Sequence, residues 1–243
     1  MEIAKRRHKY ITEITVKHLH MKKKILVISA HPDDDVIGCG GSLAKHIAAG
    51  NEVAACYMTS GEGGSIHHSK DELMKIRENE ARNAAKVIGF QNLTFLRLPD
   101  GDIAFNKENI SKLIEVMLKE KPNIIYTHYE RDFHRDHVIA YQLAFEAVKG
   151  VRYHLYQEYR GEPWPTNALL QYEVVTPIPE INYLEDISPF IEKKIAAVRE
   201  HKSQLKNIHY DELARCLARY RAISTMTGEY CENFKITLMA DVF

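Results

Sequence analysis

The stretch ILVISA, residues 25–30, decides the fold class of this chain, because it is short, apolar and rich in β-branched residues. Such a run is typical of a strand that is buried on both faces of a parallel sheet. The polar segment HPDDD, residues 31–35, follows directly, and a helix is predicted over residues 36–49, where Gly50 ends it. A strand, a polar turn and a helix in this order are the first unit of an α/β fold.

The same alternation continues along the chain. Strands are predicted at 53–59, 93–98 and 123–127, and helices at 71–88, 107–119 and 136–148. This pattern predicts a Rossmann-like, mainly parallel sheet with helices on both faces. Beyond residue 150 we expect strands at 151–157 and 170–176, helices at 189–206 and 211–225, and an edge strand at 234–239. We interpret that part as a C-terminal elaboration of one α/β domain over residues 21–243, and residues 1–20 as an N-terminal extension.

The composition narrows the class of protein. A chain of 243 residues with 45% hydrophobic and 27% charged residues suits a soluble globular domain. Lys and Arg number 33, as do Asp and Glu, so no basic surplus indicates a nucleic-acid or anionic-membrane partner. No apolar run approaches the roughly 20 residues that a membrane span needs, and the four cysteines are scattered. We therefore expect a cytoplasmic protein without a membrane span.

The segment HPDDD lies directly beyond the carboxyl end of the first predicted strand, where parallel α/β sheets bind ligands. One imidazole and three carboxylates suit a divalent cation such as zinc, which accepts imidazole nitrogen and carboxylate oxygen. The alternative is that Asp33, Asp34 and Asp35 cap the next helix, which accounts for one or two of them. The glycines of GCGG, residues 38–41, do not have the spacing of a nucleotide-binding loop, and we expect them to pack closely against the sheet.

The segment His134-Arg135-Asp136-His137 follows the fourth predicted strand and should lie at the same edge of the sheet. His134 and His137 are three residues apart at the start of a helix and can share a face. Asp136 is placed to orient one imidazole through the ring nitrogen that faces away from a metal. A lone histidine at a helix start is more often a surface or capping residue, but two histidines with an aspartate favour a metal site.

Together the two motifs resemble those of the LmbE-like or PIG-L-like N-acetylglucosaminyl deacetylases, whose signatures are A-H-P-D-D and H-x-x-D-H or H-x-D-H segments. The resemblance runs over most of residues 24–240 and includes TSGE at 59–62, RENE at 77–80 and PDG at 99–101. The chain departs from the family at Asp35, where many members have glutamate. This departure lies just outside the implied set of metal ligands.

The resemblance implies a role for each motif residue. His31, Asp34 and His137 would bind Zn²⁺, with another divalent cation as the alternative. Asp33 would be the general base, and His134, oriented by Asp136, would stabilise the oxyanion or protonate the leaving amine. Arg77 would bind substrate hydroxyl or phosphate groups, although a solvated charge on a helix is an equal alternative for this residue.

The predicted function is that of a zinc-dependent hydrolase that removes an N-acetyl group from an amino sugar or glycoconjugate of the N-acetylglucosamine type. Two alternatives stay open. One is an amidase that acts on a thiol conjugate or another N-acyl substrate. The other is a sugar- or nucleotide-binding module without catalysis. The expected partner is the small-molecule sugar substrate, and the sequence leaves the oligomeric state open.

Overall fold

The computed structural model describes residues 22–153, 155, 162–206 and 208–240. The predicted N-terminal extension, residues 1–20, therefore lies outside the described residues, as do residues 154, 156 and 157 of the strand that was predicted at 151–157.

The structure is built on a mixed sheet of seven strands in the order β3-β2-β1-β4-β5-β7-β6. Five strands are parallel: β1 (Lys24–Ser29), β2 (Glu52–Tyr57), β3 (Asn92–Phe95), β4 (Ile124–His128) and β5 (Ala168–Tyr172). The last strand, β7 (Cys231–Met239), is antiparallel to both β5 and β6 (Tyr183–Asp186). The predicted mainly parallel α/β sheet is thus confirmed.

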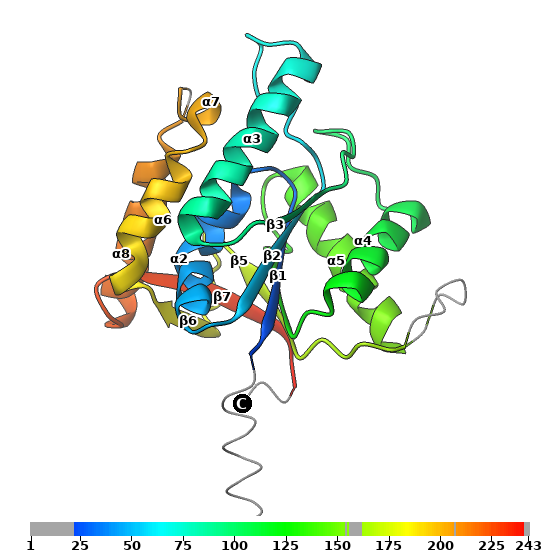
Figure 1. Ribbon diagram of the computed structural model, residues 1–243. Coiled ribbons are helices and arrows are strands. Elements are labelled where there is room, and N and C mark those ends of the chain that lie inside the picture. Colours follow the sequence, from blue (N-terminus) through cyan, green and yellow to red (C-terminus); the bar gives the residue numbers. More distant parts are fainter. Residues whose placement is uncertain (1–21, 154, 156–161, 207, 241–243) are drawn as a thin grey trace, which may run out of the picture.

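Helices cover both faces of the sheet (Figure 1). One layer consists of α2 (Asp34–Ala48), α3 (Lys70–Ile88), α6 (Ile191–Val198) and α8 (Tyr210–Thr225), and the other of α4 (Lys107–Glu120) and α5 (Arg135–Tyr153). A buried apolar cluster lies between the sheet and each layer. Burial on both faces explains why the central strands are continuous apolar runs rather than alternating ones.

The C-terminal elaboration differs from the prediction in three ways. The strand predicted at the edge is β7, which lies between β5 and β6, so the unpredicted β6 forms the edge. Residues 151–153 belong to α5 and not to a strand. The helix predicted at 189–206 is divided into a short 3₁₀ turn η1 (Ser188–Phe190), α6, and α7 (Lys202–Leu205), because His201 has non-helical backbone angles.

The connectivity creates a crevice at one point of the sheet. Strands β1 and β4 are neighbours, although β2 and β3 lie between them in the sequence. The helices that follow them, α2 and α5, pack on opposite faces (Figure 1). In such a sheet the carboxyl ends of the two strands at this switch point form the ligand site. The two predicted motifs follow β1 and β4.

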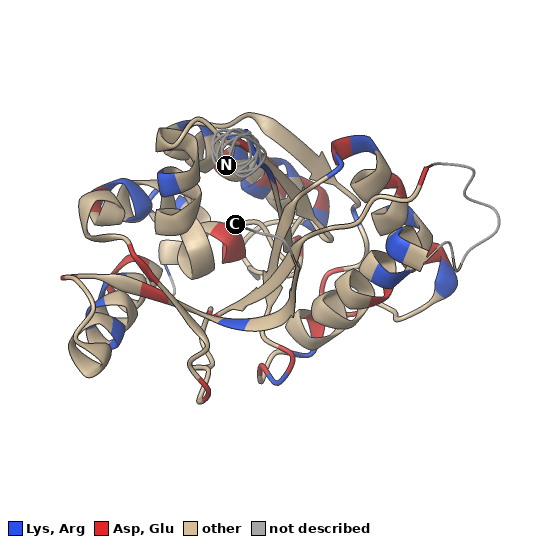
Figure 2. Ribbon diagram, turned by 90° about the horizontal axis from the view of Figure 1, so that it is seen from below, with Lys and Arg blue, Asp and Glu red and all other residues tan. Residues whose placement is uncertain are grey.

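Charge is spread evenly over the described residues. Basic and acidic positions are interspersed along the ribbon in Figure 2, and the formal net charge of the whole sequence is zero. A search of the described residues finds no helix that is long and apolar enough to cross a membrane.

Candidate active site

His31, Asp34 and His137 bring three ligand atoms together at the switch point. His31 lies in the turn after β1, Asp34 begins α2, and His137 lies in the first turn of α5. His31 Nδ1 is 3.2 Å from Asp34 Oδ2 and 3.3 Å from His137 Nε2, which is itself 3.4 Å from Asp34 Oδ1. All three side chains are buried. The predicted ligand residues from two distant segments are therefore adjacent in space.

The three residues fit a divalent metal. Burial lowers the pKa of His137, but the Asp34 and Asp132 carboxylates together outweigh it, and the pKa lies at about 9. His31 behaves in the same way, and its pKa lies well above the usual value. Beside the Asp34 carboxylate, both buried imidazoles favour their protonated forms, so positive charge is favourable at this point. A bound cation takes the place of those protons. Two imidazole nitrogens with one carboxylate form a donor set of the kind that catalytic zinc uses.

Three further carboxylates lie against the imidazoles. His31 Nε2 is 3.1 Å from Asp100 Oδ1 and 3.5 Å from Asp136 Oδ2, and His137 Nδ1 is 3.5 Å from Asp132 Oδ1. Contacts of this kind direct the opposite ring nitrogen at a metal. Asp100 and Asp132 were not predicted as site residues. Each follows a predicted strand of the parallel sheet. From that position alone, both carboxylates could have been predicted to lie at the site.

Asp136 does not have the partner that was predicted for it. Among the described residues its carboxylate faces His31 and accepts hydrogen bonds from the backbone N–H groups of Gly101, at 2.8 Å, and Ile103. Its contact with His134 is through the backbone, where the Asp136 N–H donates to His134 Nδ1 at 3.3 Å. The expectation that the Asp136 carboxylate orients the His134 ring is thus wrong, because the turn after β3 lies against that carboxylate.

His134 is half-buried and neighbours both predicted histidine ligands. Its ring stacks on His137 with centroids 4.6 Å apart, and meets His31 edge-on at 4.9 Å. Burial and these two imidazoles lower the pKa of His134. Since Nδ1 accepts a hydrogen bond, the neutral ring carries its proton on Nε2.

Asp33 lies beside the three predicted ligands and has an unusual backbone. Its φ is 127°, and its Oδ2 is 3.0 Å from Arg77 Nη2. Asp33 occupies the N-cap position of α2 but makes no side-chain capping hydrogen bond in the described structure, so the alternative role as a helix cap is contradicted for this residue. Asp34 and Asp35 lie in the first turn of the helix. Burial raises the pKa of Asp33 and Arg77 lowers it, with the result at about 7.

Arg77 is not the solvated charge that was considered as an alternative. Its side chain is 4% exposed, and its guanidinium donates to Pro32 O at 2.7 Å, Asp33 Oδ2 at 3.0 Å and Gly61 O at 3.1 Å. Arg77 also contributes to the lining of the cavity described next.

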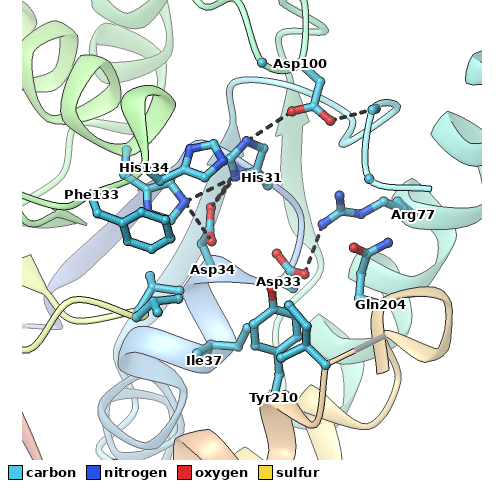
Figure 3. Close-up of a pocket in the computed structure, with 17 residues that line it drawn as sticks. His31, Asp33, Asp34, Ile37, Arg77, Asp100, Phe133, His134, Gln204 and Tyr210 are labelled. Atoms are coloured by element: carbon cyan, nitrogen blue, oxygen red, sulfur yellow. Dashed lines mark hydrogen bonds and ion pairs between the residues drawn. The ribbon is translucent and has the colours of Figure 1, made fainter. Parts of the chain in front are cut away.

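A cavity of about 450 Å³ opens over the site, and its lining is of two kinds (Figure 3). The polar side chains include Arg77, Asp100 and Gln204, and the mainly apolar ones are Ile37, Phe133, Val174, Val175, Ile208 and Tyr210. His31, Asp33, Asp34, His134 and His137 also line the cavity. The volume is that of a small-molecule site.

Comparison with known proteins assigns the family. Residues 26–148 match the family model described as PIG-L, GlcNAc-PI de-N-acetylase. The chain belongs to this de-N-acetylase family. A diacetylchitobiose deacetylase of Thermococcus kodakarensis is 32% identical over 193 residues, which are 75% of this chain and 70% of that protein. The predicted resemblance is confirmed, and the chain is a hydrolytic N-deacetylase.

Solved structures agree on the fold of this de-N-acetylase. The N,N'-diacetylchitobiose deacetylase of Pyrococcus horikoshii has a TM-score of 0.80 at 27% identity and covers 89% of this chain and 84% of that chain. A 4-carboxy-2-hydroxymuconate hydratase of Pseudomonas putida also reaches a TM-score of 0.80, at 23% identity, over 92% of this chain and 99% of that chain. Because the last protein is a hydratase, similarity of fold does not specify the reaction, and the site has to do so.

Proposed function

We propose that this de-N-acetylase is a zinc enzyme that hydrolyses the acetamide of an N-acetylglucosamine-type sugar in a glycoconjugate. The observation that carries the proposal is the convergence of His31, Asp34 and His137 with a further carboxylate, Asp33, beside them in one cavity. The names of two relatives, both deacetylases of diacetylchitobiose, support an amino-sugar substrate.

The first step needs an activated water and a group that accepts its proton. His31, Asp34 and His137 would hold zinc, which when bound would lower the pKa of water towards about 7 and polarise the amide carbonyl. Asp33 accepts the proton of the attacking water as the bond between its oxygen and the carbonyl carbon forms. A carboxyl group whose pKa lies near 7 is suited both to accept a proton and to return it. Asp33 then gives that proton to the amide nitrogen, and the carbon–nitrogen bond breaks.

His134 donates a hydrogen bond to the amide oxygen and does not protonate the amide nitrogen. Its lowered pKa leaves the ring neutral, with the proton on Nε2. A neutral imidazole in a partly buried site is a hydrogen-bond donor for the oxygen that becomes negative in the tetrahedral intermediate. Of the two roles that the resemblance implies, we therefore favour stabilisation of the oxyanion over protonation of the amine.

The polar and apolar parts of the cavity lining match the two kinds of surface that a sugar ring has. Hydroxyl groups on its rim can reach the polar side chains, and the C–H face of the ring can pack against the apolar ones. Tyr210 keeps its phenol proton, since burial and Asp33 raise its pKa to about 12, and it adds a hydroxyl donor to the lining.

A direct test measures metal content and acetate release together. The purified chain is expected to contain one zinc and to release acetate from N-acetylglucosamine or from glycosides that contain it. An N-acylated thiol conjugate is included to test the amidase alternative. Full zinc occupancy without acetate from any amino sugar would contradict the proposal and favour a binding module, whereas turnover of the thiol conjugate alone would favour the amidase.

A further inference from the structure

We propose that the mouth of the cavity is a subsite for an uncharged, apolar group, which the amino-sugar substrate carries beyond its ring. The subsite consists of the side chains of Phe133, Val175 and Ile208, which we call the apolar rim. The inference rests on the proposed function in one respect, because the amino sugar itself has to occupy the inner part of the cavity, next to the candidate metal centre.

The apolar rim is exposed, although it belongs to the lining of the cavity. Phe133 is 74% exposed, Ile208 49% and Val175 39%. Ile37 and Val174, the other aliphatic side chains of the described lining, are buried. Exposed apolar side chains that gather at a concave site mark a surface where a ligand binds. The rim therefore extends the cavity outward with apolar surface that a group on the sugar can cover.

The backbone next to the rim offers few hydrogen bonds to a hydroxylated group. The segment TPIP, residues 176–179, directly follows the valine of the rim, and its two prolines have no N–H. The N–H of Ile178 donates to Glu173 Oε1 at 2.5 Å, and that of Phe133 donates to Thr176 Oγ1 at 3.1 Å. A second sugar ring would lose the hydration of its hydroxyls here with little in return, whereas an alkyl or aryl group gains from burial.

A buried ion pair holds this part of the rim in place. Glu173, directly after β5, and Arg221, on α8, are both buried. Arg221 donates to Glu173 Oε2 from Nε at 3.1 Å and to Oε1 from Nη2. Arg221 Nη2 also donates to Ile178 O at 2.8 Å, so the pair binds both backbone groups of Ile178. The loop that carries Val175 is thus fixed at both ends, and little entropy is lost when a ligand covers it.

The charges of the lining favour an uncharged group over an anionic one. Among the described residues that line the cavity there is no lysine, and the one arginine, Arg77, lies 3.0 Å from the carboxylate of Asp33. Strong binding of a phosphate or carboxylate in proteins relies on cationic side chains. An anionic group on the apolar rim would lose its water without finding such a partner there, which costs free energy.

A series of N-acetylglucosaminides tests the subsite. Methyl, butyl and 3-carboxypropyl glycosides, in both anomeric forms, are compared for kcat and KM by acetate release. In at least one anomeric form, the longer chain of the butyl group should lower KM about tenfold relative to the methyl glycoside, with kcat little changed. The 3-carboxypropyl glycoside should show no such gain. Equal KM values for the methyl and butyl glycosides, or a KM for the carboxylate as low as that of the butyl glycoside, would overturn the proposal.

Substitutions in the rim locate this gain. Val175→Ser and Ile208→Ser remove apolar surface from side chains that are partly exposed, so both variants should fold. In each, the ratio of the methyl to the butyl KM should fall about threefold or more. Ile223→Ser is the matched control, because Ile223 is 62% exposed but does not line the cavity, and it should keep the wild-type ratio. A ratio unchanged in both rim variants would show that the butyl group binds elsewhere.

Calorimetric titration separates failure of this inference from failure of the proposed function. Acetate release from the methyl glycoside without any gain for the butyl glycoside would refute the subsite and leave the proposed function standing. If no glycoside releases acetate, the proposed function is wrong, and the affinities of the wild-type protein for the two glycosides decide the inference. Binding of the butyl glycoside about tenfold more tightly than the methyl glycoside would support the subsite. Equal affinities, or no binding of either glycoside, would refute it.

Discussion

At the scale of single residues, the site depends on carboxylates that differ in what surrounds them. Asp34 touches both histidines of the candidate metal centre, and the neighbouring Asp33 pairs with Arg77. The pKa of Asp34 lies well below its usual value despite burial, because His137, His128 and His31 surround it, whereas burial raises that of Asp33. Two adjacent residues of one type are thereby suited to different tasks, one to hold a cation and one to exchange a proton.

The first prediction concerns the metal ligands. His31→Ala and His137→Ala should each lose the bound zinc, because each leaves two of three donors. Both variants should still fold, since the strands and the two apolar clusters are unchanged. Elemental analysis with circular dichroism checks this. Full zinc occupancy in both folded variants would refute the ligand assignment.

The second prediction is a pH dependence of metal binding. The metal-free site holds protons, with the pKa of His137 at about 9 and that of His31 above its usual value. Since zinc must displace these protons, affinity should fall as the pH is lowered from 8 to 6, by roughly tenfold per pH unit for each proton displaced. Competition titration with a chelator at several pH values measures it. An affinity independent of pH over this range would show that the histidines are already neutral.

The third prediction concerns His134. Without its N–H donor, His134→Ala should retain zinc and lower kcat by about 10²–10³, with little change in KM. A trifluoroacetamide stabilises the negative oxygen by itself, so its hydrolysis should suffer less. The comparison of kcat for the acetyl and trifluoroacetyl substrates checks this. Equal losses for both would instead favour a role in protonating the amine, and loss of zinc would contradict the assignment altogether.

At the scale of elements, helix α2 has to lie close to the sheet and to the C-terminal elaboration. The interpretation of its glycines as residues that pack closely against the sheet is confirmed at Gly38, where a Cβ would lie 2.3 Å from Tyr172 on β5. Gly41 packs just as closely, but against Ile187, which follows β6 and lies outside the sheet, at 2.6 Å from an added Cβ. The helix that begins with Asp34 is therefore placed by contacts one and two turns further along.

The fourth prediction compares two neighbouring glycines of α2. Gly41→Ala should lower the free energy of unfolding by about 1–3 kcal/mol, because the buried Ile187 cannot move away without disturbing the core. Gly40→Ala is the control, since its Cβ would approach no atom closer than 3.3 Å, the distance to Cγ of Lys194, with Val36 Cβ at 3.5 Å. It should be neutral or stabilising by up to about 1 kcal/mol. Urea unfolding measures both, and equal effects would contradict the packing argument.

At the scale of the whole molecule, the cavity is assembled from segments that lie far apart in the chain. Phe133 follows β4, Val175 follows β5, and Ile208 precedes α8. The backbone N–H of Phe133 donates to Thr176 Oγ1 at 3.1 Å, which ties two of these segments together. The Phe133 ring is 74% exposed at the cavity mouth, so it is available to a ligand.

The fifth prediction is that Phe133→Ala raises KM severalfold and leaves kcat little changed. The ring takes no part in proton transfer, and it contributes area that binds ground state and transition state alike. Phe105→Ala is the control, because Phe105 is also exposed, at 49%, but does not line the cavity. Steady-state kinetics on one amino-sugar substrate checks this. A loss of kcat at constant KM would contradict it.

Much of the fold and the placing of both motifs could be predicted from the sequence. The central strands could be predicted from apolar runs, and the helices from the residues typical of helix ends. Both patterns depend only on residues that are close in the sequence. Parallel strands put their carboxyl ends at one edge, so HPDDD and HRDH were expected at the same edge of the sheet. The convergence of His31, Asp34 and His137 also requires that β1 and β4 are neighbours, which the tertiary structure decided.

Contacts between distant segments were decided by the tertiary structure alone. The carboxylate of Asp136 turned out to face His31 instead of His134, because the loop after β3 supplies its N–H partners. Arg77 is buried against Pro32 and Gly61, although its helix appears exposed and charged in the sequence. Strand β7 lies inside the sheet because β6 pairs with its outer edge. Local periodicity reports which face of an element is buried, but it carries no information on which distant segment covers that face.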